Sequence, residues 1–171
     1  IMVIAQDTTY YGIDLYGRRR LAELLTALCR IDGIEWIRLH YAYPTAFPDD
    51  VIDVMASEPK ICKYLDIPFQ HISDRMLTAM KRRHTKADAL ALIERLRERI
   101  PDIALRTTLL VGYPTETEQD MQELEQFVRD VRFDRLGVFA YSEEEGTYSA
   151  RELRDDVPEE EKQRRVDRIM R

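Results

Sequence analysis

The sequence predicts an α/β fold in the form of a partial, open βα barrel with about five parallel strands and outer helices. Apolar segments of strand length alternate with amphipathic helical patterns along the whole chain. The apolar segments show no regular polar alternation, as expected for parallel strands that are covered by helices. The helical patterns are apolar on one face only, which favours one outer layer of helices over an open doubly wound sheet.

Five segments are expected to form the strands, and turn residues mark where they end. They are residues 1–5, 35–41, 64–68, 103–111 and 136–141. Five strands are too few to close a barrel, so we expect an exposed edge or an edge completed by further sequence.

Helical patterns fill the gaps between these strands. The clearest has Leu21, Leu24, Leu25 and Leu28 at the spacing of one helix face. Others begin near residues 49, 73, 85 and 117, with Thr115 or Thr117 as the expected N-cap of the last of these. We assign residues 1–157 to the barrel and residues 158–171 to a charged helix that leads toward a further C-terminal domain.

Composition predicts an ordinary globular chain of 171 residues, 44% apolar and 34% charged. No apolar run approaches the roughly 20 residues that span a bilayer, so no membrane association is expected. Cys29 and Cys62 lie far apart and suggest a reducing, cytoplasmic location. The net charge of −6 disfavours a nucleic-acid surface on this segment and is compatible with a basic protein partner. Both chain ends fall inside expected elements, so we expect a piece of a longer protein.

One stretch, residues 106–118, combines a buried strand, a Gly-Tyr-Pro turn and an acidic helix start. This order is typical of a ligand-binding corner in a βα unit. The carboxyl ends of all five strands carry hydrogen-bonding residues, glycine or proline, in segments 6–7, 41–45, 70–73, 112–116 and 141–143. Because such ends share one rim of a barrel, the sequence predicts a ligand site there.

Structural explanations compete with functional ones at each position. Gln70 can satisfy a strand end or bind a ligand, and His71 is more readily explained as a hydrogen-bonded core residue. Arg106 can pair with Asp66 on the neighbouring strand or hold a ligand carboxylate. Gly112 can serve the turn alone or allow a ligand to approach the backbone. The three histidines show no zinc-binding spacing, and no Walker, GxGxxG or GxSxG motif is present.

Five segments together resemble the core of the radical SAM methylthiotransferases, and most closely the enzymes that modify a ribosomal protein. The segments are AQDTTYYG (5–12), YPT (43–45), CKYLDIPFQHIS (62–73), RTTLLVGYP (106–114) and LGVFAYSE (136–143). The resemblance covers essentially the whole chain and implies a barrel of the radical SAM type. It implies that the full enzyme holds [4Fe–4S] clusters, one of them on a CxxxCxxC loop, and S-adenosylmethionine (SAM). A 5′-deoxyadenosyl radical would then activate an aspartate β-carbon of a basic small-subunit ribosomal protein for methylthio transfer.

The same resemblance implies that nine residues at the strand ends contact SAM: Gln6, Asp7, Gln70, Ser73, Arg106, Gly112, Tyr113, Pro114 and Tyr141. In this assignment Arg106 meets the methionyl carboxylate, for which a guanidinium is well shaped. The Gly-Tyr-Pro turn contacts the adenine through its backbone, and Tyr141 closes the far wall of the SAM site.

The chain departs from the family pattern in three places. Cys29 and Cys62 match neither the position nor the spacing of the cluster cysteines, so we expect this segment to bind no cluster. Thr115 stands where the family usually has glycine, and the segment from Lys81 to Thr85 also lacks a glycine often found there. Two alternatives remain: a tRNA adenosine methylthiotransferase core, and a non-catalytic βα scaffold that docks a basic partner.

Overall fold

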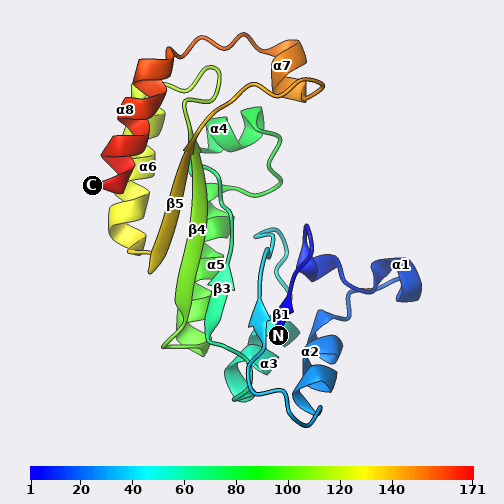
Figure 1. The fold of residues 1–171 in the computed structure, drawn as a ribbon. Helices are drawn as coiled ribbons and strands as arrows, with labels where there is room; N and C mark the ends of the chain where they lie inside the picture. The colour runs from blue at the N-terminus through cyan, green and yellow to red at the C-terminus, as the bar shows by residue number, and fades with distance from the viewer. The chain divides into compact units, whose positions relative to one another are not determined.

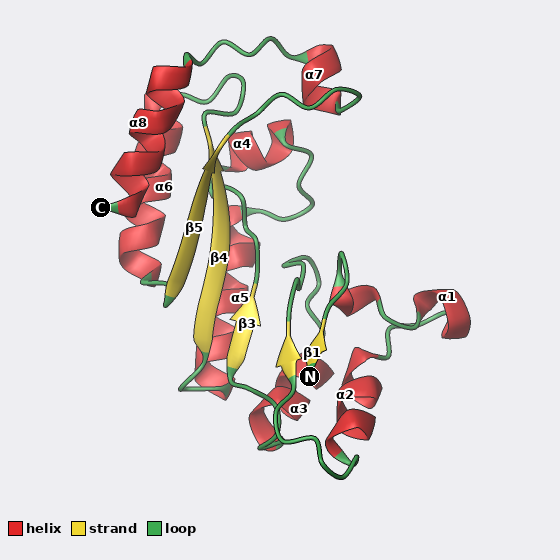
Figure 2. Ribbon diagram, in the orientation of Figure 1, coloured by secondary structure: helices red, strands yellow, loops and turns green.

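The computed structural model describes residues 1–171, which form two compact units. Unit 1 contains Ile1–Pro68 and Ala87–Arg106, and unit 2 contains Phe69–Lys86 and Thr107–Arg171. Strands alternate with helices along the chain in both units (Figure 1; Figure 2). The longest strand, β4 (Ala104–Val111), contributes its first three residues to unit 1 and the rest to unit 2.

The strands of unit 1 pair in parallel and belong to two sheets, one of β1 (Met2–Val3) and β2 (Arg38–Leu39) and one that contains β3 (Tyr64–Asp66) and β4. Strand β1 pairs in parallel with β2, and β3 pairs in parallel with the first residues of β4. Backbone hydrogen bonds also join the segments around β2 and β3, among them Ala42 N to Asp66 O at 3.1 Å. The predicted parallel α/β arrangement is therefore confirmed for these strands.

The first two strands are much shorter than predicted. Strand β1 pairs only with β2, and Met2 and Ile4 are 66% and 61% exposed. Trp36, which was expected inside the second strand, is 75% exposed and lies before it. Strand β1, which has one partner, makes half of the possible ladder bonds, so its ends leave the extended ladder early.

Helices account for the remaining regular structure of unit 1. They are η1 (Thr8–Tyr10), α1 (Ile13–Tyr16), α2 (Leu21–Cys29), α3 (Asp49–Ser57) and α5 (Lys86–Arg99). The predicted α2, α3 and α5 are present. Helices η1 and α1 were not predicted. Gly12 and Gly17 adopt left-handed conformations at the two ends of α1 and so confine it to one turn. Leu25, Ile37 and Leu65 belong to the buried core.

In unit 2, helices pack on the second half of β4 and on β5 (Arg135–Ala140). The helices are α4 (Asp74–Ala79), α6 (Glu118–Val131), α7 (Tyr148–Glu152) and α8 (Glu159–Met170). Figure 2 shows β4 and β5 pointing the same way, and Tyr141 N donates to Val111 O at 2.8 Å just beyond them. Helix α8 packs against β5 and α6. The boundary at residue 157 stays a prediction.

Two features hold unit 2 together. Thr117 caps α6 as predicted, and a reciprocal bond pairs its backbone N–H with the Asp120 carboxylate, which forms a capping box. Phe69 packs edge-on against Phe127 with ring centroids 6.0 Å apart, and the ring centroid of Phe133 lies 5.5 Å from that of Phe127.

No helix in either unit combines the length and the apolar character that a membrane-spanning segment needs.

Candidate functional site

The predicted site residues of the first strand end lie in unit 1. Gln6 is exposed just after β1, whereas Asp7 is half-buried and engaged in local structure. Asp7 Oδ1 accepts from Thr9 N at 3.0 Å, from Thr9 Oγ1 at 2.8 Å and from Tyr43 N at 3.4 Å. Asp7 therefore ties the segment after β1 to the segment after β2. This explains Asp7 structurally, and contact of Gln6 or Asp7 with SAM stays a prediction.

Arg106 forms the ion pair that the sequence offered as its structural explanation. Asp66 and Arg106 are directly opposed in the parallel register of β3 and β4, and Arg106 Nη1 lies 2.7 Å from Asp66 Oδ2. The Asp66 side chain is 3% exposed, and its other oxygen, Oδ1, has no hydrogen-bond partner. The Arg106 side chain is 33% exposed, so solvent still reaches part of it. The guanidinium neutralises the Asp66 carboxylate and so offsets the cost of burying it.

Gln70 continues the strand pairing of unit 2 in an unusual backbone conformation. Its N–H donates to Thr108 O at 2.9 Å, and its carbonyl accepts from Leu110 N at 2.8 Å. Its φ of +70° lies in the left-handed region, which a non-glycine residue adopts only at a cost. Strain of this kind is frequent at functional sites, and the half-buried side chain of Gln70 stays a candidate ligand contact.

The Gly-Tyr-Pro turn, which we define as residues 112–114, is buried at the carboxyl end of β4. Gly112 has a φ of +74°, and a Cβ built on it would meet Lys162 Cγ at 2.4 Å. Packing and backbone conformation both require glycine here, which supports the structural explanation of Gly112. Its backbone N–H donates to Glu116 Oε2 at 2.7 Å. The approach of a ligand to this turn stays a prediction.

Two aromatic rings lie together beside this turn. Tyr113 and Tyr141 pack edge to face with centroids 5.1 Å apart, and Met76 belongs to the same buried cluster. Tyr113 Oη reaches Ala79 O at 3.4 Å, whereas Tyr141 Oη is buried and has no hydrogen-bond partner. A buried hydroxyl without a partner costs free energy, so this atom is a candidate for bonding a ligand.

Ser73 is committed to a buried network with helix α6. Its hydroxyl donates to Asp120 Oδ1 at 2.7 Å, and Arg75 binds the same carboxylate through Nε and Nη2. Burial raises the pKa of Asp120, but hydrogen bonds from Arg75, Thr117 and Ser73 outweigh it and hold that pKa well below its ordinary value. The Ser73 hydroxyl therefore has an internal partner, and its contact with SAM stays a prediction.

His71 is a hydrogen-bonded core residue, as the sequence favoured. Its Nδ1 accepts from Ile72 N at 2.8 Å and Ser73 N at 3.0 Å, so the ring proton is on Nε2. Nε2 lies 3.3 Å from Glu116 Oε1. Glu116 also binds Arg165, with Nη1 to Oε2 at 2.5 Å. The sequence placed Glu116 in the strand-end segment 112–116 but assigned it no role, and it did not single out Arg165. The available signal was an acid just after the turn and an arginine on the final helix.

The two cysteines do not fit an iron–sulfur cluster. Cys29 is buried on the apolar face of α2, and burial raises the pKa of its thiol, which disfavours the thiolate that a metal needs. Cys62 is half-buried beside β3. No group of three or more histidine, cysteine or carboxylate side chains is arranged to hold a metal ion.

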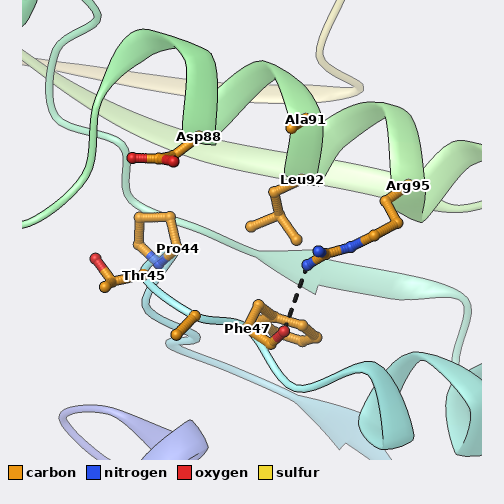
Figure 3. Close-up of a pocket in the computed structure, with 8 residues that line it drawn as sticks. Pro44, Thr45, Phe47, Asp88, Ala91, Leu92 and Arg95 are labelled. Carbon is orange, nitrogen blue, oxygen red and sulfur yellow. Dashed lines mark hydrogen bonds between the residues drawn. The ribbon is translucent and has the colours of Figure 1, made fainter.

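A cavity of about 260 Å³ lies within unit 1, between helix α5 and the segment that follows β2. Figure 3 shows residues that line it. Pro44 and Thr45 line one side, and Asp88 and Arg95 line the other. Arg95 Nη2 donates to Phe47 O at 3.4 Å across it. The cavity thus contains Pro44 and Thr45 of one predicted strand end but none of the nine predicted SAM contacts.

Comparisons with known proteins agree with one another. The family model described as the radical SAM superfamily matches residues 2–128. The chain is 58% identical over 168 residues to the ribosomal protein uS12 methylthiotransferase RimO of Porphyromonas gingivalis, covering 98% of this chain and 39% of that protein. It is 56% identical over 170 residues to RimO of Christiangramia forsetii, covering 99% and 38%. The chain therefore spans about two fifths of the length of these relatives.

Solved structures show the same fold at much lower identity. Coproporphyrinogen III oxidase (HemN) from Escherichia coli, titled a radical SAM enzyme, has a TM-score of 0.64 at 22% identity, over 88% of this chain and 34% of that one. Elp3 of Methanocaldococcus infernus has a TM-score of 0.59 at 13% identity, over 85% and 37%. These likenesses support the predicted open βα arrangement of parallel strands with outer helices.

Proposed function

The chain belongs to the radical SAM superfamily, and from that premise we propose that it is the SAM-binding core of a methylthiotransferase acting on ribosomal protein uS12. The observation that carries the proposal is the 58% identity over 98% of the chain to RimO. The match spans 168 of the 171 residues and so includes all five segments in which the sequence itself resembled ribosomal-protein methylthiotransferases. We assign methylthio transfer to an aspartate β-carbon of uS12 as the reaction of the full-length enzyme.

The superfamily implies SAM and a [4Fe–4S] cluster in the full enzyme. The residues of this chain fit SAM. Tyr141 offers a buried hydroxyl that has no protein partner, next to the ring of Tyr113 and the Gly112–Pro114 turn. Cys29 and Cys62 do not fit the cluster, so we derive no step from it here. SAM would supply radical chemistry at a C–H bond once an external reductant has delivered one electron to the full enzyme.

The chain's own residues would bind and orient SAM and keep water away from it. We assign the methionyl carboxylate to Arg106, because a guanidinium is a strong carboxylate partner. We assign the adenine to the turn at residues 112–114, since strand ends followed by glycine and a helix start commonly receive nucleotides. Tyr141 would donate or accept one hydrogen bond through Oη. Gln6, Asp7, Gln70 and Ser73 complete the proposed set.

The test uses the full-length enzyme with its clusters reconstituted, together with SAM, a reductant, a sulfur source and purified uS12. We expect SAM to bind and the mass of uS12 to increase by one methylthio group on an aspartate. A tRNA transcript serves as the competing substrate. Modification of the tRNA with uS12 unchanged would overturn the assignment of substrate, and failure to bind SAM would overturn the assignment of cofactor.

A further inference from the structure

A charged cluster lies buried beneath the Gly112–Pro114 turn in unit 2. Its centre is Glu116, whose side chain is fully buried. Glu116 Oε2 accepts the Gly112 N–H at 2.7 Å and binds Arg165 Nη1 at 2.5 Å, while Oε1 faces His71 Nε2 at 3.3 Å. One carboxylate therefore joins the first residue of the turn to a side chain of helix α8.

Arg165 is held firmly in this position. Its Nη1 also donates to the Glu116 backbone carbonyl at 3.2 Å, and its Nε donates to Glu161 Oε1 at 3.0 Å on the same helix. The side chain is 9% exposed. Burial lowers the pKa of Arg165, but its hydrogen bonds to Glu116 and Glu161 outweigh it and raise that pKa, so the guanidinium stays charged.

A second contact, one helical turn earlier, places α8 directly on the turn. The side-chain stem of Lys162 occupies the space that a Cβ of Gly112 would need. The Lys162 ammonium is bound at 2.6 Å to Asp155 and at 3.5 Å to Glu159. Lys162 and Arg165 are three residues apart and so lie on one face of α8, and that face covers the turn.

Anchoring of the helix alone does not explain Arg165. Helix α8 already has another arginine, Arg168, which binds Glu118 through two bonds of 2.9 Å and Glu125 through one of 2.8 Å, all on α6. That anchor leaves the turn untouched and stays partly exposed. Burying a further charge under the turn is a poor way to gain stability, because desolvation offsets most of the attraction. The specific effect of Arg165 is on Glu116, and through it on the Gly112 N–H.

We propose that Arg165 is a positioning residue for SAM: it fixes the Glu116 carboxylate, which in turn fixes the backbone of the Gly112–Pro114 turn. The inference rests on the proposed function, because SAM is the ligand of this turn there. A turn held in its binding conformation loses less conformational freedom when the ligand arrives. The position of helix α8 therefore affects SAM binding, through Arg165, Glu116 and the turn.

The test compares Arg165→Gln with the matched control Arg168→Gln in the full-length, cluster-loaded enzyme. Equilibrium dialysis gives the SAM dissociation constant, and hydrogen exchange of a peptide spanning residues 110–118 reports protection of the Gly112 amide. We expect Arg165→Gln to raise the dissociation constant about tenfold, which corresponds to the loss of one charge-assisted bond, and to speed exchange in that peptide. Arg168→Gln should change neither.

The outcomes separate the inference from the function on which it rests. If the wild-type enzyme binds no SAM, the proposed function fails. If it binds SAM, and Arg165→Gln binds equally well with unchanged exchange, the role of Arg165 is refuted. If Arg165→Gln does not fold, Arg165→Lys is measured instead. It keeps the charge but not the forked geometry, and it should weaken SAM binding by a smaller factor; wild-type affinity in Arg165→Lys would then overturn the proposal.

Discussion

Replacing Arg106 by alanine should lower the free energy of unfolding, because it leaves the buried Asp66 carboxylate without its ion-pair partner. The substitution removes the one partner seen for Asp66 Oδ2, at 2.7 Å, while Oδ1 already has none. Loss of one member of a buried ion pair typically costs about 3–5 kcal/mol. Because the Arg106 side chain is 33% exposed, part of its attraction is already screened, and we expect a loss of about 3 kcal/mol.

Urea unfolding at pH 7, followed by circular dichroism, measures this loss as a shift of the midpoint at constant m. The companion variant Asp66→Asn should cost about 1.5 kcal/mol, because it replaces an ion pair by a hydrogen bond from the guanidinium to an uncharged amide oxygen. The double variant should be no less stable than Arg106→Ala alone, since it leaves no buried charge behind. The expected coupling energy is therefore at least about 1.5 kcal/mol in magnitude. Additive effects, or a loss below about 1 kcal/mol in Arg106→Ala, would refute this reasoning.

The same two variants separate folding from ligand binding in the full-length enzyme. If Arg106 also holds the SAM carboxylate, Arg106→Ala should weaken SAM binding, whereas Asp66→Asn keeps the guanidinium and most of the affinity. Equal affinities in the two variants would restrict Arg106 to its structural role.

Three further outcomes are expected. Thr115→Gly should stabilise the chain by about 1 kcal/mol in the same unfolding assay, because Thr115 is β-branched and has a φ of +74°; a loss of stability would contradict this. Gly112→Ala should destabilise by about 3 kcal/mol, since it meets both the positive φ and the Lys162 stem at 2.4 Å; a neutral effect would show that α8 moves aside freely. Stability should fall as the pH drops below the ordinary Asp120 pKa of 3.8 toward its lower folded value, because protonation breaks the bonds to Arg75. Asp120→Asn should cost about 2 kcal/mol at pH 7, and this difference in stability from the wild type should shrink in acid. A difference that does not change with pH would exclude the Asp120 carboxylate as its source.

The alternation of strands and helices could be predicted because it depends on local apolar periodicity. The ion pair of Arg106 with Asp66 could also be predicted, since adjacent parallel strands place charged residues opposite each other. The strand lengths could not, because they depend on how many edges find a partner. Helix α7 was not predicted, because its five residues are too few for a periodic signal.

The buried cluster around Glu116 was beyond prediction for a different reason. Glu116 and Arg165 are 49 residues apart, and an arginine on a charged helix is usually exposed to solvent. Only the packing of α8 on the turn brings them together. The resemblance described from the sequence had indicated two places where the family often has glycine and this chain does not, the segment 81–85 and Thr115. Lys81 and Thr115 adopt a positive φ, of +54° and +74°, so the backbone there keeps a glycine-like shape without glycine.

Helix α8 presents cations, rather than an apolar stripe alone, to the rest of unit 2. Its buried residues are Lys162, Arg165 and Ile169. A purely apolar helix face tolerates small movements, because one aliphatic contact can replace another. A face that carries two cations does not tolerate rotation about the helix axis, since rotation would separate Arg165 from Glu116 and Lys162 from Asp155. The helix is therefore held in one rotational orientation, and an engineered linker or fusion that rotates α8 should break both ion pairs at once.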